Sequence, residues 1–417
     1  MASHTTPPGP RWLIGYILVI WFVISFVTNL LGPLMPVLIK DFHLSLALAG
    51  FLPFSFFLAY GLISIPAGAL LESRGAASVL TLALLLNFSG SLWIALLPGY
   101  SSVVVGLFII GLGMAMLQVV INPLMRSTVG EAEFAFYSVA AQLVFGLASF
   151  LSPYVYTQLI ETANAAPGSM HWLRFYWIFL GVFLALLILT RLVRLPEVEL
   201  RDDEKSGGWS AYRQLIKQPQ VWYFFLGIVA YVGTEQSLAN WMAEFLQRYH
   251  QLPSSSYGAD AVAWFWGLMS LGCLLGLLLL KLFDSKQVLA SFSVLAALSV
   301  ASALFGPAKL ALYAFPAAGF FLSVMFSIVF SLALNSRQDL HGAFSGILCS
   351  GILGGAILPM LVGLLGDYLG LRTALCLVFV SIAYLFSLSF WAKPLVSNQT
   401  LSFSQLIRRE KPLLNQN

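Results

Sequence analysis

Residues 221–246 read VWYFFLGIVAYVGTEQSLANWMAEFL, an apolar run with a small polar group near its centre. Because a helix needs about 20 mostly apolar residues to cross a bilayer, this stretch predicts a membrane-spanning helix. Glu235 lies well inside it, where an ionised carboxylate costs about 3 kcal/mol or more without a partner or an aqueous cavity. Such an acid is a candidate functional residue, and the alternative is a protonated, hydrogen-bonded packing residue.

The rest of the chain has the same character. It is 59% hydrophobic and only 9% charged, which leaves too few polar residues to cover a soluble globule of this length. Counting residues 221–246, twelve apolar runs are long enough to span a bilayer as helices. The sequence therefore predicts an all-α membrane protein with twelve transmembrane helices. Residues 1–11 are polar and the run that follows is too long for a signal peptide, so the first span is expected to stay in the membrane.

Several landmark residues recur at one constant separation along the chain. The spacing is 206 residues, and it relates Asn29 to Glu235, Gly113 to Gly319, Glu133 to Asp339, and Pro153 to Pro359. Such an offset predicts two copies of one helical unit, with function between them. We expect two pseudo-symmetric six-helix bundles at residues 1–194 and 219–393, a linker at 195–218 and a C-terminal tail at 394–417.

Orientation is predicted from the distribution of Lys and Arg. With the N-terminus inside, 16 of the 21 cationic residues fall in inner segments and 5 in outer ones. This bias predicts that both termini are cytoplasmic, in a bacterial inner membrane. It also explains the net charge of +4, so no nucleic-acid partner is expected. The second half of the linker places Trp209, Tyr212 and Ile216 opposite Arg213 and Lys217, a pattern that can lie along the inner membrane surface. The mixed charges of the segment favour a solvated linker between the bundles, and a regulatory partner site is the alternative.

Signatures of catalysis are missing from the sequence. There is no Walker loop, no HExxH motif and no nucleophile-elbow serine, and the five histidines are scattered. Cys273, Cys349 and Cys376 all fall inside predicted spans, where packing is their default role. We therefore expect no enzyme activity, no cofactor and no metal site.

The GxxxG pairs at residues 272–276 and 351–355 favour packing within the chain over a dimer face, which predicts a monomer in the lipid bilayer.

Amides and an indole surround the intramembrane acid and suggest the ligand. Next to Glu235 and Thr234 on the same span stand Gln236, Asn240 and Trp241. Amides supply donors and acceptors, and an aromatic face covers apolar C–H groups, which suits a polyhydroxylated small molecule. The first half offers Asn29, Gln118, Asn122 and Gln142 on three spans. Each amide alone is as well explained by bridging between helices, but together they predict a polar central cavity.

Several short motifs resemble the major facilitator superfamily, and within it the fucose, glucose and galactose permease family. They are Ile65-Pro66-Ala67-Gly68, Gly111-Leu112-Gly113, Asn122-Pro123, Ala141-Gln142, Tyr231-Val232-Gly233-Thr234-Glu235, the segment 326–334, and Gly354-Gly355 with Pro359. The resemblance covers about residues 15–390. It implies two bundles that rock around a central sugar site formed by Asn29, Gln118, Asn122, Gln142, Gln236, Asn240 and Trp241.

The sequence departs from that family in two places. Fucose–proton symporters of the family have carboxylates on the first and fourth spans, where this chain has Gly32 and Gln118. The family's proton route is therefore not carried over, and the relatives with an acid on the seventh span are the closer comparison. In residues 68–75, which resemble the superfamily's loop between spans two and three, Glu72 stands where Asp is usual and Ser73 where a cation is usual.

These observations predict a secondary active transporter that imports a monosaccharide, a hexose or a deoxyhexose. Coupling to H⁺ or Na⁺ is expected at Glu235, with Thr234 beside it. Two alternatives remain open on sequence grounds, an exporter of drugs or metabolites on the same fold and a transporter-like receptor or scaffold.

Overall fold

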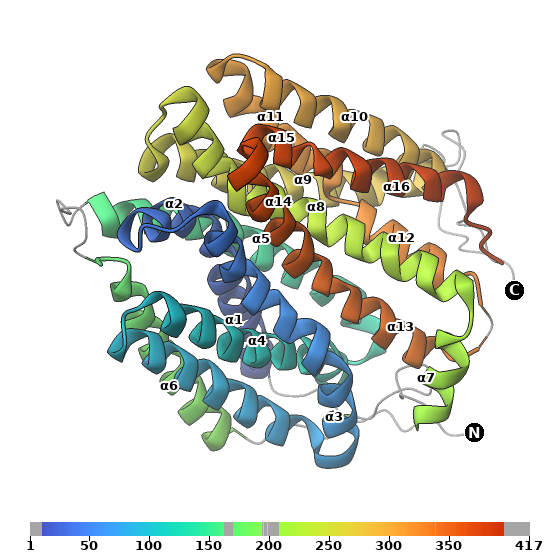
Figure 1. Ribbon diagram of the computed structural model, residues 1–417. Coiled ribbons are helices and arrows are strands. Elements are labelled where there is room, and N and C mark those ends of the chain that lie inside the picture. The colour runs from blue at the N-terminus through green and yellow to red at the C-terminus, as the bar shows by residue number, and fades with distance from the viewer. Residues whose placement is uncertain are drawn as a thin grey trace, which may run out of the picture.

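The computed structural model describes residues 11–161, 170–193, 195, 198, 208–337 and 339–395. Within these ranges the chain is almost wholly helical and contains no strand. Its helices form two bundles, one from each half of the chain, which appear as the blue-to-green and yellow-to-red halves of Figure 1.

The first bundle contains the helices α1 (Arg11–Asn29), α2 (Leu31–Asp41), α3 (Leu46–Leu96), α4 (Tyr100–Val129), α5 (Glu131–Glu161) and α6 (Leu173–Leu192). One span is divided between α1 and α2, because Pro33 has no N–H to continue the helical hydrogen bonds through Leu30. Conversely, α3 joins two spans through a kink at Gly75, whose φ of 73° lies in the left-handed region that favours glycine.

The second bundle is more finely divided. It contains α8 (Pro219–His250), a π-helical turn (Ser254–Gly258), α9 (Ala259–Leu282), α10 (Ser285–Phe305), α11 (Ala308–Leu322), α12 (Met325–Leu334), α13 (His341–Ser350), a 3₁₀ turn (Gly351–Leu353), α14 (Gly354–Leu369), α15 (Leu371–Leu375) and α16 (Leu377–Trp391). Each break in the last three spans is short, so successive pieces continue one another across the membrane.

The predicted number of spans agrees with the helices that the structure describes. Nine segments are long and apolar enough to cross a membrane, and one of them, Leu46–Leu96, holds two spans on either side of Gly75. The two remaining spans are α5 and α8, whose 31 and 32 residues are long enough to cross a bilayer. Twelve transmembrane helices in two six-helix bundles are thus confirmed.

A short helix, α7 (Gly208–Ile216), occupies the second half of the predicted linker. Its buried face is formed by Ala211, Tyr212 and Leu215, which pack toward α13 and α8. Burial raises the pKa of the Tyr212 hydroxyl, and the nearby Glu72 carboxylate raises it further, so the phenol stays protonated. The predicted amphipathic segment therefore docks on the second bundle. Most of residues 195–207 and nearly all of the tail lie outside the described residues.

The two ends of the molecule differ in how closely the bundles approach. We call the end that carries α7 and the Gly75 kink the linker end, and the other the far end. At the far end, a methyl group added to Gly363 would lie 2.3 Å from the Leu46 carbonyl oxygen, and one added to Gly32 would lie 2.5 Å from the Ala239 carbonyl oxygen. Backbone therefore packs directly on backbone there.

Hydrogen bonds also join the bundles at the far end. The Asp367 carboxylate accepts from the N–H groups of Leu46 and Ala47, at 2.8 and 2.9 Å, at the first turn of α3. The Thr157 hydroxyl donates to the Ser255 carbonyl oxygen at 2.7 Å. The far end is therefore closed in this structure.

Candidate functional site: a cavity between the bundles

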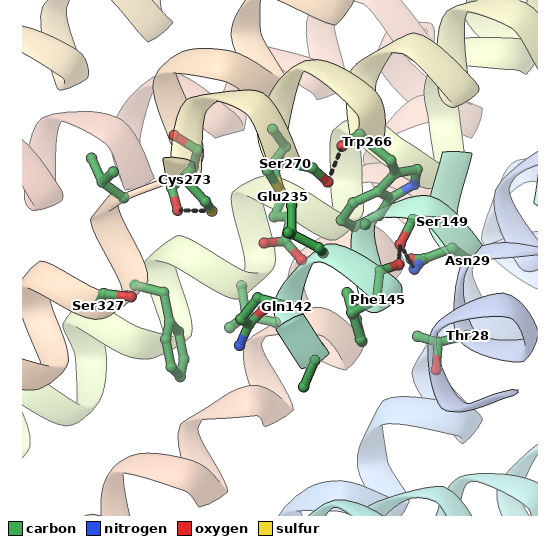
Figure 2. Close-up of a pocket in the computed structure, with 18 of the residues that line it drawn as sticks. Thr28, Asn29, Gln142, Phe145, Ser149, Glu235, Trp266, Ser270, Cys273 and Ser327 are labelled. Atoms are coloured by element: carbon green, nitrogen blue, oxygen red, sulfur yellow. Dashed lines mark hydrogen bonds between the residues drawn. The ribbon is translucent and has the colours of Figure 1, made fainter. Parts of the chain in front are cut away.

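A cavity of about 450 Å³ lies between the two bundles. This volume falls within the range of about 300–1,000 Å³ that small-molecule sites occupy. Both halves of the chain line it, and Figure 2 shows side chains from α1, α5, α8, α9 and α12 around it. Its polar lining includes Asn29, Gln118, Asn122, Gln142, Ser149, Tyr231, Glu235, Gln236, Ser270 and Ser327.

The cavity occupies the middle of the molecule and extends toward the linker end. On α9 its lining runs from Trp266 to Leu280, close to the helix end at Leu282. On α8 the lining ends at Gln236, so the fourteen residues that lead to the far end contribute none of the described lining. The site is therefore set against the closed far end and faces the linker end.

All four amide residues predicted from the first half line this cavity. Asn122 and Gln142 expose much of their surface to it, Gln118 is half-buried, and Asn29 is 4% exposed. They come from α1, α4 and α5, so the fold brings together residues that are far apart in sequence. Their role in binding a ligand stays a prediction.

Glu235 also lines the cavity and is only partly buried. The Gln236 side-chain amide donates to Glu235 Oε1 at 3.0 Å, and Tyr231 lies one turn earlier on the same side of α8. Contact with a cavity is one of the two conditions that make an intramembrane acid tolerable, and hydrogen-bonded partners are the other. The structure supplies both for Glu235.

The other residues predicted on α8 lie in different positions. Gln236 lines the cavity, whereas Thr234, Asn240 and Trp241 are buried and are not among its lining residues. Trp241 is fully buried in the second bundle and donates its indole N–H to the Pro359 carbonyl oxygen at 3.0 Å. Asn240 donates to the backbone oxygen of Gln236 at 2.8 Å, and to its Oε1 at 3.3 Å.

Helical geometry explains this division. Residues on one helix face recur three or four positions apart, which places Glu235 above Tyr231 and Val232, all on the cavity side. Thr234 and Trp241 point to other faces of the same helix. Which residues of α8 line the cavity thus depends on the helix face on which they lie, and closeness to Glu235 in the sequence predicts it less well.

Sequence reasoning also overlooked several lining residues. Trp21, Tyr60, Ser149, Trp266 and Ser270 all line the cavity. In a membrane protein, serines and aromatic residues occur throughout the spans, so nothing in their local sequence separates these five from packing residues. Only Ser149 carried a usable signal, because it lies seven residues, or two turns, after Gln142 on α5.

Two helical bundles around a central cavity that faces one end and carries polar side chains from both halves are the architecture of a membrane transporter. The sequence profile of the Major Facilitator Superfamily matches residues 17–348. The chain therefore belongs to the major facilitator superfamily, and it is a multi-pass membrane transporter and not an enzyme.

Individual relatives of the chain include sugar transporters. It is 29% identical over 383 residues to a glucose/galactose transporter of Brucella abortus, which covers 88% of this chain and 90% of the relative. It is 24% identical over 377 residues to the L-fucose-proton symporter of Escherichia coli, at 84% and 86% coverage. A solved structure of the Escherichia coli fucose:proton symporter superposes with a TM-score of 0.65, 20% identity and coverage of 92% and 99%. The resemblance to the fucose, glucose and galactose permease family is thus confirmed.

Proposed function

We propose that this protein is a secondary active transporter that imports a monosaccharide, a hexose or a deoxyhexose, together with H⁺ or Na⁺. The observation that supports it is the cavity itself, in which amide side chains from the first bundle face an acid and an amide from the second. Amides can both donate to and accept from sugar hydroxyls. Relatives named for glucose, galactose and fucose transport support the same substrate class.

Glu235 is the proposed coupling residue. It is the acid that faces the cavity among the described lining residues, and it contacts the cavity directly. In a cavity that opens to each side in turn, its carboxylate can take up and release H⁺; if it remains ionised, it can instead attract Na⁺ with help from the oxygen of Asn29. Thr234 is buried behind it, so its part in ion binding depends on movement of α8.

The proposed setting is a bacterial inner membrane with both termini cytoplasmic, which makes the linker end the cytoplasmic end. A monomer is proposed because the small-residue pairs are occupied within the chain. Gly272 and Gly276 face Ser323 and Val324, and Gly355 faces Phe57. These glycines therefore let the chain's own helices approach, as small residues do at membrane interfaces.

Uptake of radiolabelled D-glucose, D-galactose and L-fucose into proteoliposomes tests this function. We expect accumulation of at least one sugar when an inward H⁺ or Na⁺ gradient is imposed, and only equilibration without it. Accumulation driven by an outward gradient would indicate an exporter. Absence of transport and of binding for all three sugars would contradict the sugar assignment and favour another substrate or a receptor role.

A further inference from the structure

A buried group of hydroxyls between α1 and α5 holds the amide of Asn29. Its Nδ2 lies 2.8 Å from Ser149 Oγ and 3.4 Å from Ser25 Oγ. The two serine oxygens lie 2.6 Å apart, and the Phe145 carbonyl oxygen lies 2.6 Å from Ser25 Oγ and 3.0 Å from Ser149 Oγ. Ser25 and Ser149 are 0% and 1% exposed, so water does not compete for these contacts.

The number of hydroxyl protons decides which way the amide of Asn29 points. The two oxygen–oxygen contacts of 2.6 Å each need a proton between them, and the two serines have one hydroxyl proton each, so none is left for the longer contact between Ser149 Oγ and the Phe145 carbonyl oxygen. If Ser149 donated to a reversed Asn29, one of those contacts would have no proton and two lone pairs would face each other. Ser149 therefore accepts, and Asn29 must present its NH₂ group to the serines.

The carbonyl oxygen of Asn29 is then the group left for the cavity, which this residue lines. We infer that Ser25 and Ser149 are positioning residues that fix Asn29 as a hydrogen-bond acceptor toward the ligand. At this point the site selects a ligand hydroxyl that donates. The inference rests on the proposed function and specifies which partner donates in the hydrogen bond between Asn29 and the ligand. Glu235, at the repeat-related position, presents carboxylate oxygens to the same cavity, so both bundles offer an acceptor.

Fluorinated sugars test whether the ligand hydroxyl donates to Asn29, because a C–F group cannot donate a hydrogen bond. The probes are D-glucose, D-galactose and the four derivatives of the better-bound sugar in which fluorine replaces the hydroxyl at C2, C3, C4 or C6. In the wild-type protein we expect at least one derivative to bind about tenfold more weakly or worse, because Asn29 loses its donor partner.

The test compares Ser149→Ala with a matched control, Ser152→Ala. Ser152 lies one turn further along α5 and donates to the Phe26 carbonyl oxygen at 3.0 Å across the same α1–α5 interface. In Ser149→Ala the amide of Asn29 is free to turn and offer its NH₂, so the penalty at that one fluorinated position should shrink to about threefold or less. In Ser149→Ala, the loss of affinity on fluorination at the other positions should stay as in the wild type. In Ser152→Ala, the loss of affinity at every position should stay as in the wild type.

The possible failures can be told apart. Fluorine penalties that are the same in Ser149→Ala and wild type at every position would overturn the inference while leaving the sugar site intact. Equal changes in Ser149→Ala and Ser152→Ala would also overturn it, since they would report general loosening of the interface. If the wild type binds neither sugar, the proposed function fails and the inference with it. Should Ser149→Ala not fold, Ser25→Ala removes the second acceptor and makes the same comparison.

Discussion

At the residue scale, the two halves of the repeat place different chemistry at the same position. Asn29 and Glu235 are 206 residues apart and both line the cavity. The amide is neutral and held by two serines, whereas the carboxylate can carry charge and accepts a hydrogen bond from the Gln236 amide. The constant offset predicts that the two positions correspond in two copies of one helical unit, and only the second copy has an acid there.

Glu235→Gln tests that division of roles. Glutamine keeps the shape and the bond with Gln236 but holds the site neutral in every state. We expect accumulation of sugar against its gradient to be lost, while exchange of labelled for unlabelled sugar across the membrane continues. Both are measured in the same proteoliposomes. A variant that still concentrates sugar at the wild-type level would show that Glu235 is structural.

The amides should differ in importance according to whether they reach the cavity. Gln142→Ala removes an exposed lining amide and should weaken sugar binding by about 1–3 kcal/mol, as expected for an unpaired buried hydroxyl. Asn240→Ala acts only through Gln236, so we expect a smaller loss. Isothermal titration calorimetry of both purified variants measures this, and an equal or larger loss in Asn240→Ala would place the ligand nearer the far end.

At the element scale, the sequence predicts features of a helix that depend on its own residues. It does not predict features that depend on which other helices pack against it. The length of the apolar runs predicted the spans. The breaks within the last three spans, and the choice of which α8 residues face the cavity, depend on the helices packed around them. Asn240 and Trp241 illustrate this, because only the positions of Gln236 and Pro359 show that their polar atoms are already used.

Glycines at the far end make the closed contact between α3 and α14 possible. Gly363→Ala would place a methyl group 2.3 Å from the Leu46 carbonyl oxygen, so the two helices must move apart. We expect faster alkylation of a cysteine placed at Leu46, which is 2% exposed, in a background without the three native cysteines. Gly68→Ala is the control on α3, because an added methyl group there meets nothing within 4 Å. If the alkylation rate is unchanged in Gly363→Ala, the contact between α3 and α14 accommodates the added methyl group without separating.

At the scale of the whole molecule, topology is the first test. The cationic bias of 16 to 5 predicts that the linker end, with both termini, faces the cytoplasm. Fusions of a cytoplasm-active fluorescent reporter and a periplasm-active phosphatase to the C-terminus should give fluorescence without phosphatase activity. Phosphatase activity would reverse the orientation, and with it the direction in which the cavity now opens.

Alternating access requires that the far end open, and the hydrogen bonds of Asp367 across the bundles oppose this. Its carboxylate accepts two N–H bonds across the bundles, at 2.8 and 2.9 Å, from the first turn of α3, where the helix dipole favours negative charge. Asp367→Asn removes the charge and leaves one acceptor oxygen. The closed state should lose about 1–2 kcal/mol, which changes the ratio of closed to open molecules about 5- to 30-fold.

Spin labels at the far end report that ratio directly. Leu97 and Phe305 are 51% and 63% exposed and lie at the far ends of the two bundles, so labels there disturb little packing. In a variant without native cysteines, Asp367→Asn should move the distance distribution between labels at these positions toward longer values. Asp284→Asn is the matched control, since Asp284 caps α10 within one bundle by accepting from the Lys286 N–H at 2.8 Å. If the two variants give the same distribution, closure of the far end depends on backbone packing at Gly32 and Gly363 and not on the carboxylate, because that packing is intact in both.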